Sequence, residues 1–393
     1  MKMKLAAVGA LALCTLTAQA ADVRMYGIID TGIIVERNHM GTKDASTYAR
    51  EEFGINLGPR VGLIADENLG DDLKFHMVLE NLFESDNGAM RFNRLFGGES
   101  SAALIGSFGE VALGRMGALT SPFGHWGVFG MQATPFGFGW GRAGGVHWMV
   151  GGDRLDNTVS WASPKMGDVT VYAQYSFQTG SNPIAGVEEV HTADNNRRAS
   201  MAVKYQTPRV TVVGTVDQIF HPSPSTKTSW AGEKDTQIAS LTTNFLVTDD
   251  VRLYVMGQVF KNYYTVPGTP VYSPKGLIGA ANLAADNQDG ISGRGFDGYV
   301  LGVSAKIKAW GGDLLLTAAY DDFDYKGNVK AGQETNLKRY MCGVAYEYPV
   351  SKHTHLYASA NVTHGKGLFD SKNFSGSDDP NSEQVMFGLT HFF

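Results

Sequence analysis

Residues 382–393 read SEQVMFGLTHFF, and this stretch decides the fold class of the chain. Alternate residues fall into two rows, a period of two that is typical of a β-strand with unlike faces. The row that ends on the last residue contains Val385, Phe387, Leu389, His391 and Phe393. The strand continues to a terminal aromatic residue with no polar tail, which predicts that another strand pairs with its edge.

The same alternation recurs along the whole chain. In residues 23–36, for example, Met25, Ile29 and Ile33 share one parity, whereas Tyr26 and Asp30 share the other. Half of each such segment is apolar and half is polar, and no long window shows the apolar stripe of a helix. The pattern predicts sixteen strands, over residues 23–36, 53–66, 71–84, 97–106, 109–116, 155–163, 168–178, 197–206, 209–220, 236–247, 250–262, 296–309, 312–325, 338–349, 353–364 and 384–393.

Short and long connections between these segments alternate strictly. A β-sandwich in which one face of each sheet is exposed to solvent would explain one or two such strands. A meander whose tight turns all lie at one end and whose long loops lie at the other is typical of a membrane barrel. We therefore expect an all-β fold, a closed antiparallel barrel of sixteen transmembrane strands, apolar outside and polar inside. Its longest connection is residues 117–153.

The first twenty residues have the three parts of a secretory signal. Lys2 and Lys4 precede an apolar run, and the small residues Ala18 and Ala20 provide a cleavage site. The run is too short to anchor the chain in a bilayer. We therefore expect residues 1–20 to be a signal peptide and residues 21–393 to form the barrel.

Composition excludes several classes of function. Charged residues make up 18% of the chain and the formal net charge is −6, which indicates no nucleic-acid partner. Beyond the signal, Cys342 is the only cysteine, so no disulfide framework or cysteine-rich metal site is expected. The sequence indicates no cofactor, no metal and no catalytic residue.

Several motifs, in order, resemble those of Gram-negative general porins, of the kind typical of β-proteobacteria. They are MYGIIDTGI at 25–33, RVGLIADENLGDDLKFHMVLE at 60–80, FGEVALGR at 108–115, RLDNTVSWASPKMGDVTVYAQYS at 154–176 and GLTHFF at 388–393. The resemblance implies a homotrimer of barrels in the outer membrane, each with a water-filled pore. It also implies periplasmic turns, extracellular loops, and a third loop (residues 117–153) that folds inward as the constriction.

The resemblance, with strand parity, also suggests which residues line the constriction. Arg60 has inward parity, and GRAGGV at 141–146 places Arg142 where related porins have a pore-facing arginine. Residues 111–152 contain no Asp or Glu, so we expect a weak anion preference, strengthened in acid by His125 and His147. The predicted set is Arg60, Arg142, Asp30, Glu80, Ser121, Phe123 and His125.

Two other groups of residues are expected to act outside the pore. Arg115 shares outward parity with Val111 and Leu113, and an arginine facing lipid costs roughly 2–4 kcal/mol, so it needs a protein partner. The resemblance implies a trimer contact, with Glu84 or Asp86 of a neighbouring subunit. The terminal row of Phe387, Leu389, His391 and Phe393 resembles the signal read by the β-barrel assembly machinery, after periplasmic chaperones deliver the chain to the lipid and lipopolysaccharide of the outer membrane.

We therefore expect a general diffusion porin that passes ions and small hydrophilic solutes and catalyses nothing. A sugar- or anion-selective porin is the alternative, because aromatic residues in the third loop could form a slide for pyranose rings. Those residues are Phe123, Trp126, Phe129, Phe136, Phe138, Trp140 and Trp148. A more remote alternative is an outer-membrane barrel enzyme, although no serine elbow or paired acid accompanies the histidines at 353, 355 and 364.

Overall fold

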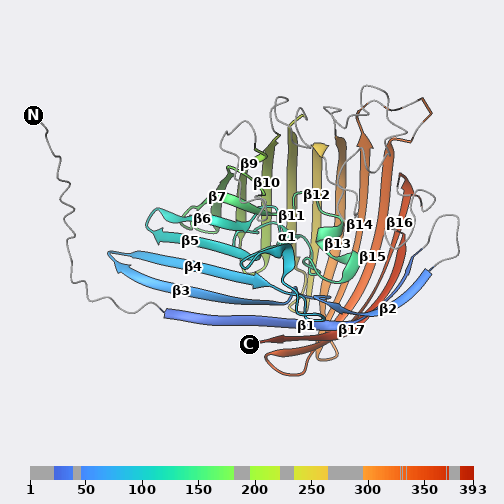
Figure 1. Ribbon diagram of the computed structural model, residues 1–393, viewed down its shortest axis with the longest axis horizontal. Coiled ribbons are helices and arrows are strands. Elements are labelled where there is room, and N and C mark those ends of the chain that lie inside the picture. Colours follow the sequence, from blue (N-terminus) through green and yellow to red (C-terminus); the bar gives the residue numbers. More distant parts are fainter. Residues whose placement is uncertain are drawn as a thin grey trace, which may run out of the picture.

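The computed structural model describes most of the chain between Asp22 and Phe393 (Figure 1). The described residues are 22–38, 46–180, 195–221, 234–263, 295–327, 329, 331–332, 334–368, 370 and 381–393. The predicted signal peptide, residues 1–20, lies outside them. None of the described helices is long and apolar enough to cross a membrane.

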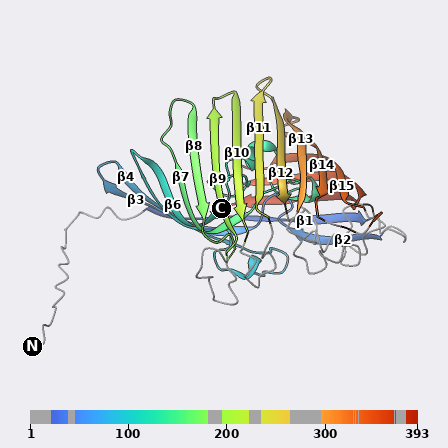
Figure 2. The same ribbon diagram turned by 90° about the horizontal axis from the view of Figure 1, so that it is seen from above.

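One antiparallel sheet of seventeen strands makes up the fold, and it closes on itself because β17 pairs with β1 (Figures 1 and 2). The strands are β1 (Asp22–Asn38), β2 (Ser46–Phe53), β3 (Arg60–Gly70), β4 (Leu73–Leu82), β5 (Glu99–Gly106), β6 (Gly109–Gly117), β7 (Arg154–Ala162), β8 (Val169–Ser176), β9 (Arg197–Gln206), β10 (Val210–Phe220), β11 (Thr236–Leu246), β12 (Val251–Tyr263), β13 (Phe296–Ala309), β14 (Gly312–Tyr325), β15 (Asn336–Pro349), β16 (Thr354–Gly367) and β17 (Ser382–Phe392).

Strands β2 and β3 together occupy one position in the barrel wall. Both pair with β1, Phe53 opposite Thr31 and Arg60 opposite Ile28, so they follow one another along the same neighbour. The seventeen strands therefore form a sixteen-stranded closed barrel, which confirms the predicted fold class. The connections at the opposite end from the loops, such as residues 71–72 between β3 and β4, are short turns.

The prediction of one unbroken strand over residues 53–66 is wrong, because residues 54–59 leave the sheet. Gly54 has a φ of +65°, a conformation that favours glycine, and Pro59 has no N–H to donate to a neighbouring strand. The freed backbone is held by the Asp30 carboxylate, which accepts hydrogen bonds from the N–H groups of Asn56 and Leu57, each at 3.2 Å. This excursion, residues 54–59, places main chain beside the barrel interior.

The predicted alternation of faces is confirmed along the strands. On β17, Val385 is 54% exposed and Phe387 51%, whereas Met386 between them is 1% exposed. The same contrast appears on β1, where Met25 is exposed and Asp30 is buried. The apolar row faces outward, as a wall in lipid requires, and the other row faces the interior.

The last residue extends the pairing that closes the barrel. Gly27 and Phe393 exchange two backbone hydrogen bonds, N–H to oxygen at 2.9 and 3.1 Å. A Cβ atom on Gly27 would lie 2.1 Å from the Phe393 ring, so the ring covers the glycine directly. The backbone of Phe393 extends the β1–β17 ladder, and its side chain covers the seam.

We predict that removing Phe393 impairs assembly rather than conduction. The deletion removes both hydrogen bonds and the ring, and in lipid an unpaired backbone group costs several kcal/mol. Outer-membrane yield, measured by membrane fractionation, should fall steeply. Phe393→Ala keeps the backbone bonds and should retain an intermediate yield. A normal yield of the truncated chain contradicts the prediction.

Candidate functional site: the loop inside the barrel

The segment between β6 and β7 crosses the interior of the barrel (Figures 1 and 2). It contains α1 (Gly130–Ala133), η2 (Gly141–Ala143) and η3 (Gly145–His147). Helix α1 contacts β10, β11 and β12, and η2 contacts β15 and β16. The prediction that residues 117–153, the inward loop, fold into the lumen is therefore confirmed.

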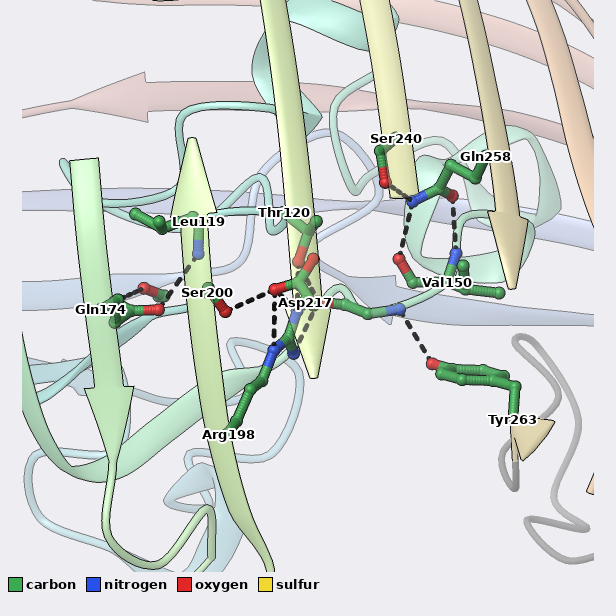
Figure 3. Close-up of polar contacts among 12 residues, drawn as sticks. Leu119, Thr120, Val150, Gln174, Arg198, Ser200, Asp217, Ser240, Gln258 and Tyr263 are labelled. Atoms are coloured by element: carbon green, nitrogen blue, oxygen red, sulfur yellow. Dashed lines mark hydrogen bonds and ion pairs between the residues drawn. The ribbon is translucent and has the colours of Figure 1, made fainter. Parts of the chain in front are cut away.

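Two glutamines on the wall hold the two stems of the inward loop (Figure 3). The side chain of Gln174 accepts a hydrogen bond from Leu119 N–H at 3.2 Å and donates one to the Gly117 carbonyl at 3.0 Å. Gln258 makes the same pair of bonds to Val150, at 2.9 and 3.0 Å. Each amide replaces the backbone partner that a loop lacks, so both stems are fixed to the wall.

A buried ion pair lies between these two glutamines (Figure 3). The side chains of Arg198 and Asp217 are 1% and 0% exposed, and Arg198 Nη2 lies 2.8 Å from Asp217 Oδ1. Arg198 also donates to the Gly151 carbonyl at 3.2 Å and to the Thr120 hydroxyl. Tyr263 accepts from Gly151 N–H at 2.8 Å. A charged group of the wall thus binds both ends of the inward loop.

We predict that Arg198→Met destabilises the barrel strongly. The change leaves the Asp217 carboxylate buried without its cation, which costs about 3–5 kcal/mol. The double change Arg198→Met/Asp217→Leu removes both charges and should recover most of that free energy of unfolding. Urea unfolding in detergent checks this, with Arg209→Met in the exposed turn after β9 as the control. Equal losses for the single and double variants contradict it.

Most aromatic residues of the inward loop serve as packing. Trp126, Phe129, Phe136, Trp140 and Trp148 are each at most 2% exposed. Glycines of the wall make room for the loop, since a Cβ on Gly302 would lie 2.8 Å from the Trp148 ring and one on Gly343 2.7 Å from the Ala143 methyl. Of the seven aromatic residues, only Phe123 and Phe138 remain partly exposed, with ring centroids 4.9 Å apart.

The two predicted arginines lie beside acids of the wall. Arg60 Nη1 is 3.2 Å from Glu80, and Tyr26 donates to the same carboxylate at 2.9 Å. Arg142 Nη2 is 3.3 Å from Glu36. Glu80 belongs to the constriction set predicted from the sequence. Glu36 is absent from the predicted set, although it has the inward parity of β1.

The structure places three other predicted residues, Asp30, Ser121 and His125, away from these pairs. Asp30 is fully buried, and it also accepts a hydrogen bond from Tyr357 at 2.9 Å, so its carboxylate supports the excursion 54–59. Ser121 is fully buried, and its hydroxyl accepts from Phe123 N–H at 3.2 Å. His125 is exposed and lies 2.9 Å from Glu110 of β6. Neither Asp30 nor Ser121 presents a polar group to the lumen.

The pKa values of the two histidines of the inward loop are shifted in opposite directions. Hydrogen bonding to Glu110 raises the pKa of His125 above its ordinary value. Burial, with Arg142 and Arg339 nearby, lowers the pKa of His147 to about 3. His147 therefore gains its positive charge at a lower pH than His125.

A cavity of about 510 Å³ lies between the inward loop, β1, β2 and the excursion 54–59. Its charged side chains are Arg50, Arg60, Arg91, Arg142, Arg154, Glu36 and Glu52. Phe123 and Phe138 face it from the inward loop. The predicted residues Arg60, Phe123 and Arg142 therefore share one cavity, with an excess of positive charge.

Three of the five arginines are absent from the set predicted by sequence. Arg154 opens β7 one residue before the predicted start, and a register shift opposite Gly114 and Met116 separates it from the inward residues Thr158 and Ser160, so parity alone does not place it. Arg91 lies in η1 (Arg91–Asn93), within the connection between β4 and β5. The period of two of a strand does not apply there, so it could not indicate where the side chain points. Arg50 belongs to β2, which lies outside the predicted strands.

Arg115, expected at a subunit interface, has a partner within its own chain. Its Nη1 lies 2.5 Å from Asp156, and its Nε donates to the Gly97 carbonyl at 3.0 Å. Glu84 and Asp86 lie in a small turn after β4, where Glu84 accepts a hydrogen bond from Asn87 at 2.7 Å. The cost of burying the Arg115 charge is thus offset without a neighbouring subunit.

Comparison with known proteins agrees with this architecture. The family described as Gram-negative porin matches residues 6–368 of the chain. An outer membrane porin protein of Bordetella pertussis is 29% identical, and Outer membrane porin protein 32 of Delftia acidovorans is 25% identical. Both alignments cover 100% of this chain and 100% of the relative.

Solved structures show the same fold at lower identity. The anion-selective porin from Comamonas acidovorans superposes with a TM-score of 0.64 at 19% identity, covering 95% of this chain and 100% of that one. OmpF of Salmonella typhi, in complex with daunomycin, gives a TM-score of 0.60 at 13% identity, covering 95% and 98%. At these identities the likeness shows a shared fold and nothing further.

Proposed function

Because this chain belongs to the Gram-negative porin family and is an outer-membrane porin, we propose that it is a general diffusion channel with a weak preference for anions. Small hydrophilic solutes and ions cross it passively, down their gradients. The observation that carries the proposal is the cavity of about 510 Å³ beside the inward loop, lined by five arginines and two glutamates.

The charges of this cavity act where the lumen is partly filled by protein. Arg60 and Arg142 are paired with Glu80 and Glu36, whereas residues 117–152 of the inward loop contain no carboxylate and Asp153 does not line the cavity. Fixed charges interact more strongly in such a confined space than in bulk water. The surplus of guanidinium groups therefore favours the entry of anions, although the whole chain has a net charge of −6.

Selective uptake of sugars is less well supported. A slide for pyranose rings needs a row of exposed aromatic faces. Five of the seven aromatic side chains of the inward loop are at most 2% exposed, and the remaining two, Phe123 and Phe138, face a cavity rich in arginine. We also infer that the protein catalyses no reaction, since its relatives are named as porins.

We further propose that the working assembly is a homotrimer in the outer membrane, with lipid and lipopolysaccharide around it. Each subunit would reach the membrane through periplasmic chaperones and the assembly machinery, which would read the outward row that ends on Phe393. Arg115 and the turn that contains Glu84 and Asp86 remain our proposed contact between subunits.

Selectivity tests the channel proposal directly. Under a potassium chloride gradient at about 0.1 M, where the Debye length is about 10 Å, the reversal potential of the wild type should indicate a weak anion preference. Arg142→Glu places a second acid beside Glu36 and should shift the reversal potential toward cations. At about 1 M the Debye length is about 3 Å, and the preference should shrink.

Arg209→Glu is the matched control, because it makes the same change of charge in an exposed turn, where Arg209 faces Asp249. It should leave the reversal potential unchanged. A cation-selective wild type, or equal shifts for the two variants, would refute the assignment of Arg142 to the narrow part of the pore.

Trimer stability tests the proposed subunit contact. If Glu84 or Asp86 of a neighbour binds Arg115, then Arg115→Ala, Glu84→Gln and Asp86→Asn should each leave the barrel folded. Arg115→Ala and one of the acid variants should both lower the temperature at which trimers dissociate in detergent gels. If only Asp156→Asn reproduces the effect of Arg115→Ala, the contact between subunits is wrong.

A further inference from the structure

The cavity beside the inward loop contains a small open space over Gly58. A Cβ atom at this position would lie 3.6 Å from Arg91 Nη1, 3.7 Å from Arg60 Nη2 and 3.9 Å from the Phe138 ring. Two guanidinium groups and an aromatic ring therefore surround one point, which stays open because residue 58 has no side chain. All of these residues line the cavity.

Two adjacent aromatic rings, each in contact with an arginine, border this space. Phe138 and Phe123 lie side by side, with centroids 4.9 Å apart. Arg60 Cζ lies 5.7 Å from the Phe138 centroid, and Arg154 Cζ lies 3.9 Å from that of Phe123. We call Gly58, Arg60, Arg91, Phe123, Phe138 and Arg154 the arginine–aromatic cradle.

Two cations of the cradle have no acid of their own. Arg60 pairs with Glu80, but in the described part of the chain neither Arg91 nor Arg154 forms a salt bridge. The buried Arg154 Nε has no hydrogen-bond acceptor among the described residues. Arg91 Cζ instead lies over the rings of Phe53 and Phe92, at 5.0 and 5.3 Å. A ring attracts a guanidinium group but leaves its N–H groups, in the plane, available to an anion.

The backbone next to Arg91 is also strained. Phe92 and Asn93 have φ angles of 58° and 53°, in the left-handed region that side chains other than glycine rarely adopt. Such a conformation persists only where the surrounding structure holds it. The connection between β4 and β5 thus holds Arg91 over the cavity in a defined position.

We propose that the arginine–aromatic cradle binds aromatic carboxylates of the benzoate class during their passage through the pore. This rests on the proposed diffusion channel and names a class of solute within it. The carboxylate lies between Arg60 and Arg91, since guanidinium groups bind the two oxygens of a carboxylate through paired N–H groups. The ring of the solute packs against Phe138 and Phe123, which gain from a flat apolar partner.

Ring and charge are both needed in this geometry. An aliphatic acid satisfies the arginines but lacks the flat aromatic ring that stacks on the two phenylalanine faces, and a neutral aromatic solute leaves Arg91 unpaired. Binding at such a site slows the solute in the pore, so it reduces the ion current while the site is occupied. This reduction gives a direct measure of affinity.

Current recordings with purified protein in planar bilayers test the proposal. Benzoate is added over a concentration series and compared with cyclohexanecarboxylate, which has the charge without the aromatic ring, and with benzyl alcohol, which has the ring without the charge. We expect benzoate to reduce the current with a Kd at least about tenfold lower than either comparator. Equal affinities for benzoate and cyclohexanecarboxylate overturn the proposal.

Two variants locate the site. Gly58→Leu fills the space between Arg60 and Arg91, and Arg91→Gln removes a guanidinium group; each should raise the Kd for benzoate about tenfold. Arg209→Gln, in a distant turn, should not. Because leucine also narrows the pore, Arg91→Gln is the decisive variant, with ion conductance as the check that the barrel has assembled. An unchanged Kd in Arg91→Gln refutes the site.

The outcome separates this inference from the proposed channel. A wild-type protein that conducts ions with an anion preference, yet does not distinguish benzoate from its comparators, contradicts the cradle alone. A protein that forms no conducting pore contradicts the diffusion channel itself.

Discussion

Pairing between β1 and β17 is the interaction on which the rest of this structure depends. Within lipid, backbone N–H and carbonyl groups have no water to bind, so a sheet is stable there only when its edges meet. The ladder from Ile28 opposite Phe392 to Asn38 opposite Ser382, extended by Phe393 against Gly27, satisfies this condition. Once the sheet is closed, one face must be apolar and the other encloses a polar interior that a loop can enter.

The interior imposes the same requirement on the inward loop. Main chain that crosses a barrel has lost its strand partners, and the wall supplies replacements through side chains. Gln174 and Gln258 act as partners for the two stems, and Arg198 with Asp217 binds between them. The inward loop is therefore fixed to the wall, and its position sets the shape of the pore.

The positive charge of the cavity also depends on how distant segments are placed. The excursion 54–59 exists because Asp30 binds two of its N–H groups, and it brings Gly58 into the cavity beside Arg60 and Arg91. Acids of the wall offset some of the arginines, whereas the inward loop adds no acid to the cavity. The excess of positive charge that we propose for the pore thus depends on contacts between segments far apart in the sequence.

The sequence by itself determined most of the strands, their faces and the closure of the barrel, because the alternation that ends at Phe393 is a local pattern with a period of two. It also located the inward loop by its length and placed Arg60 and Arg142 by parity and resemblance. It missed β2 and the break before β3. Tertiary structure alone decided the partners: Glu36 for Arg142, Asp156 for Arg115, and the approach of Arg91 to the cavity. Parity gives the face of a strand on which a residue lies, but it contains no information about which distant residue stands opposite across the lumen. Nor did parity reveal that residues 54–59 leave the sheet, since that break depends on the buried carboxylate of Asp30 on another strand.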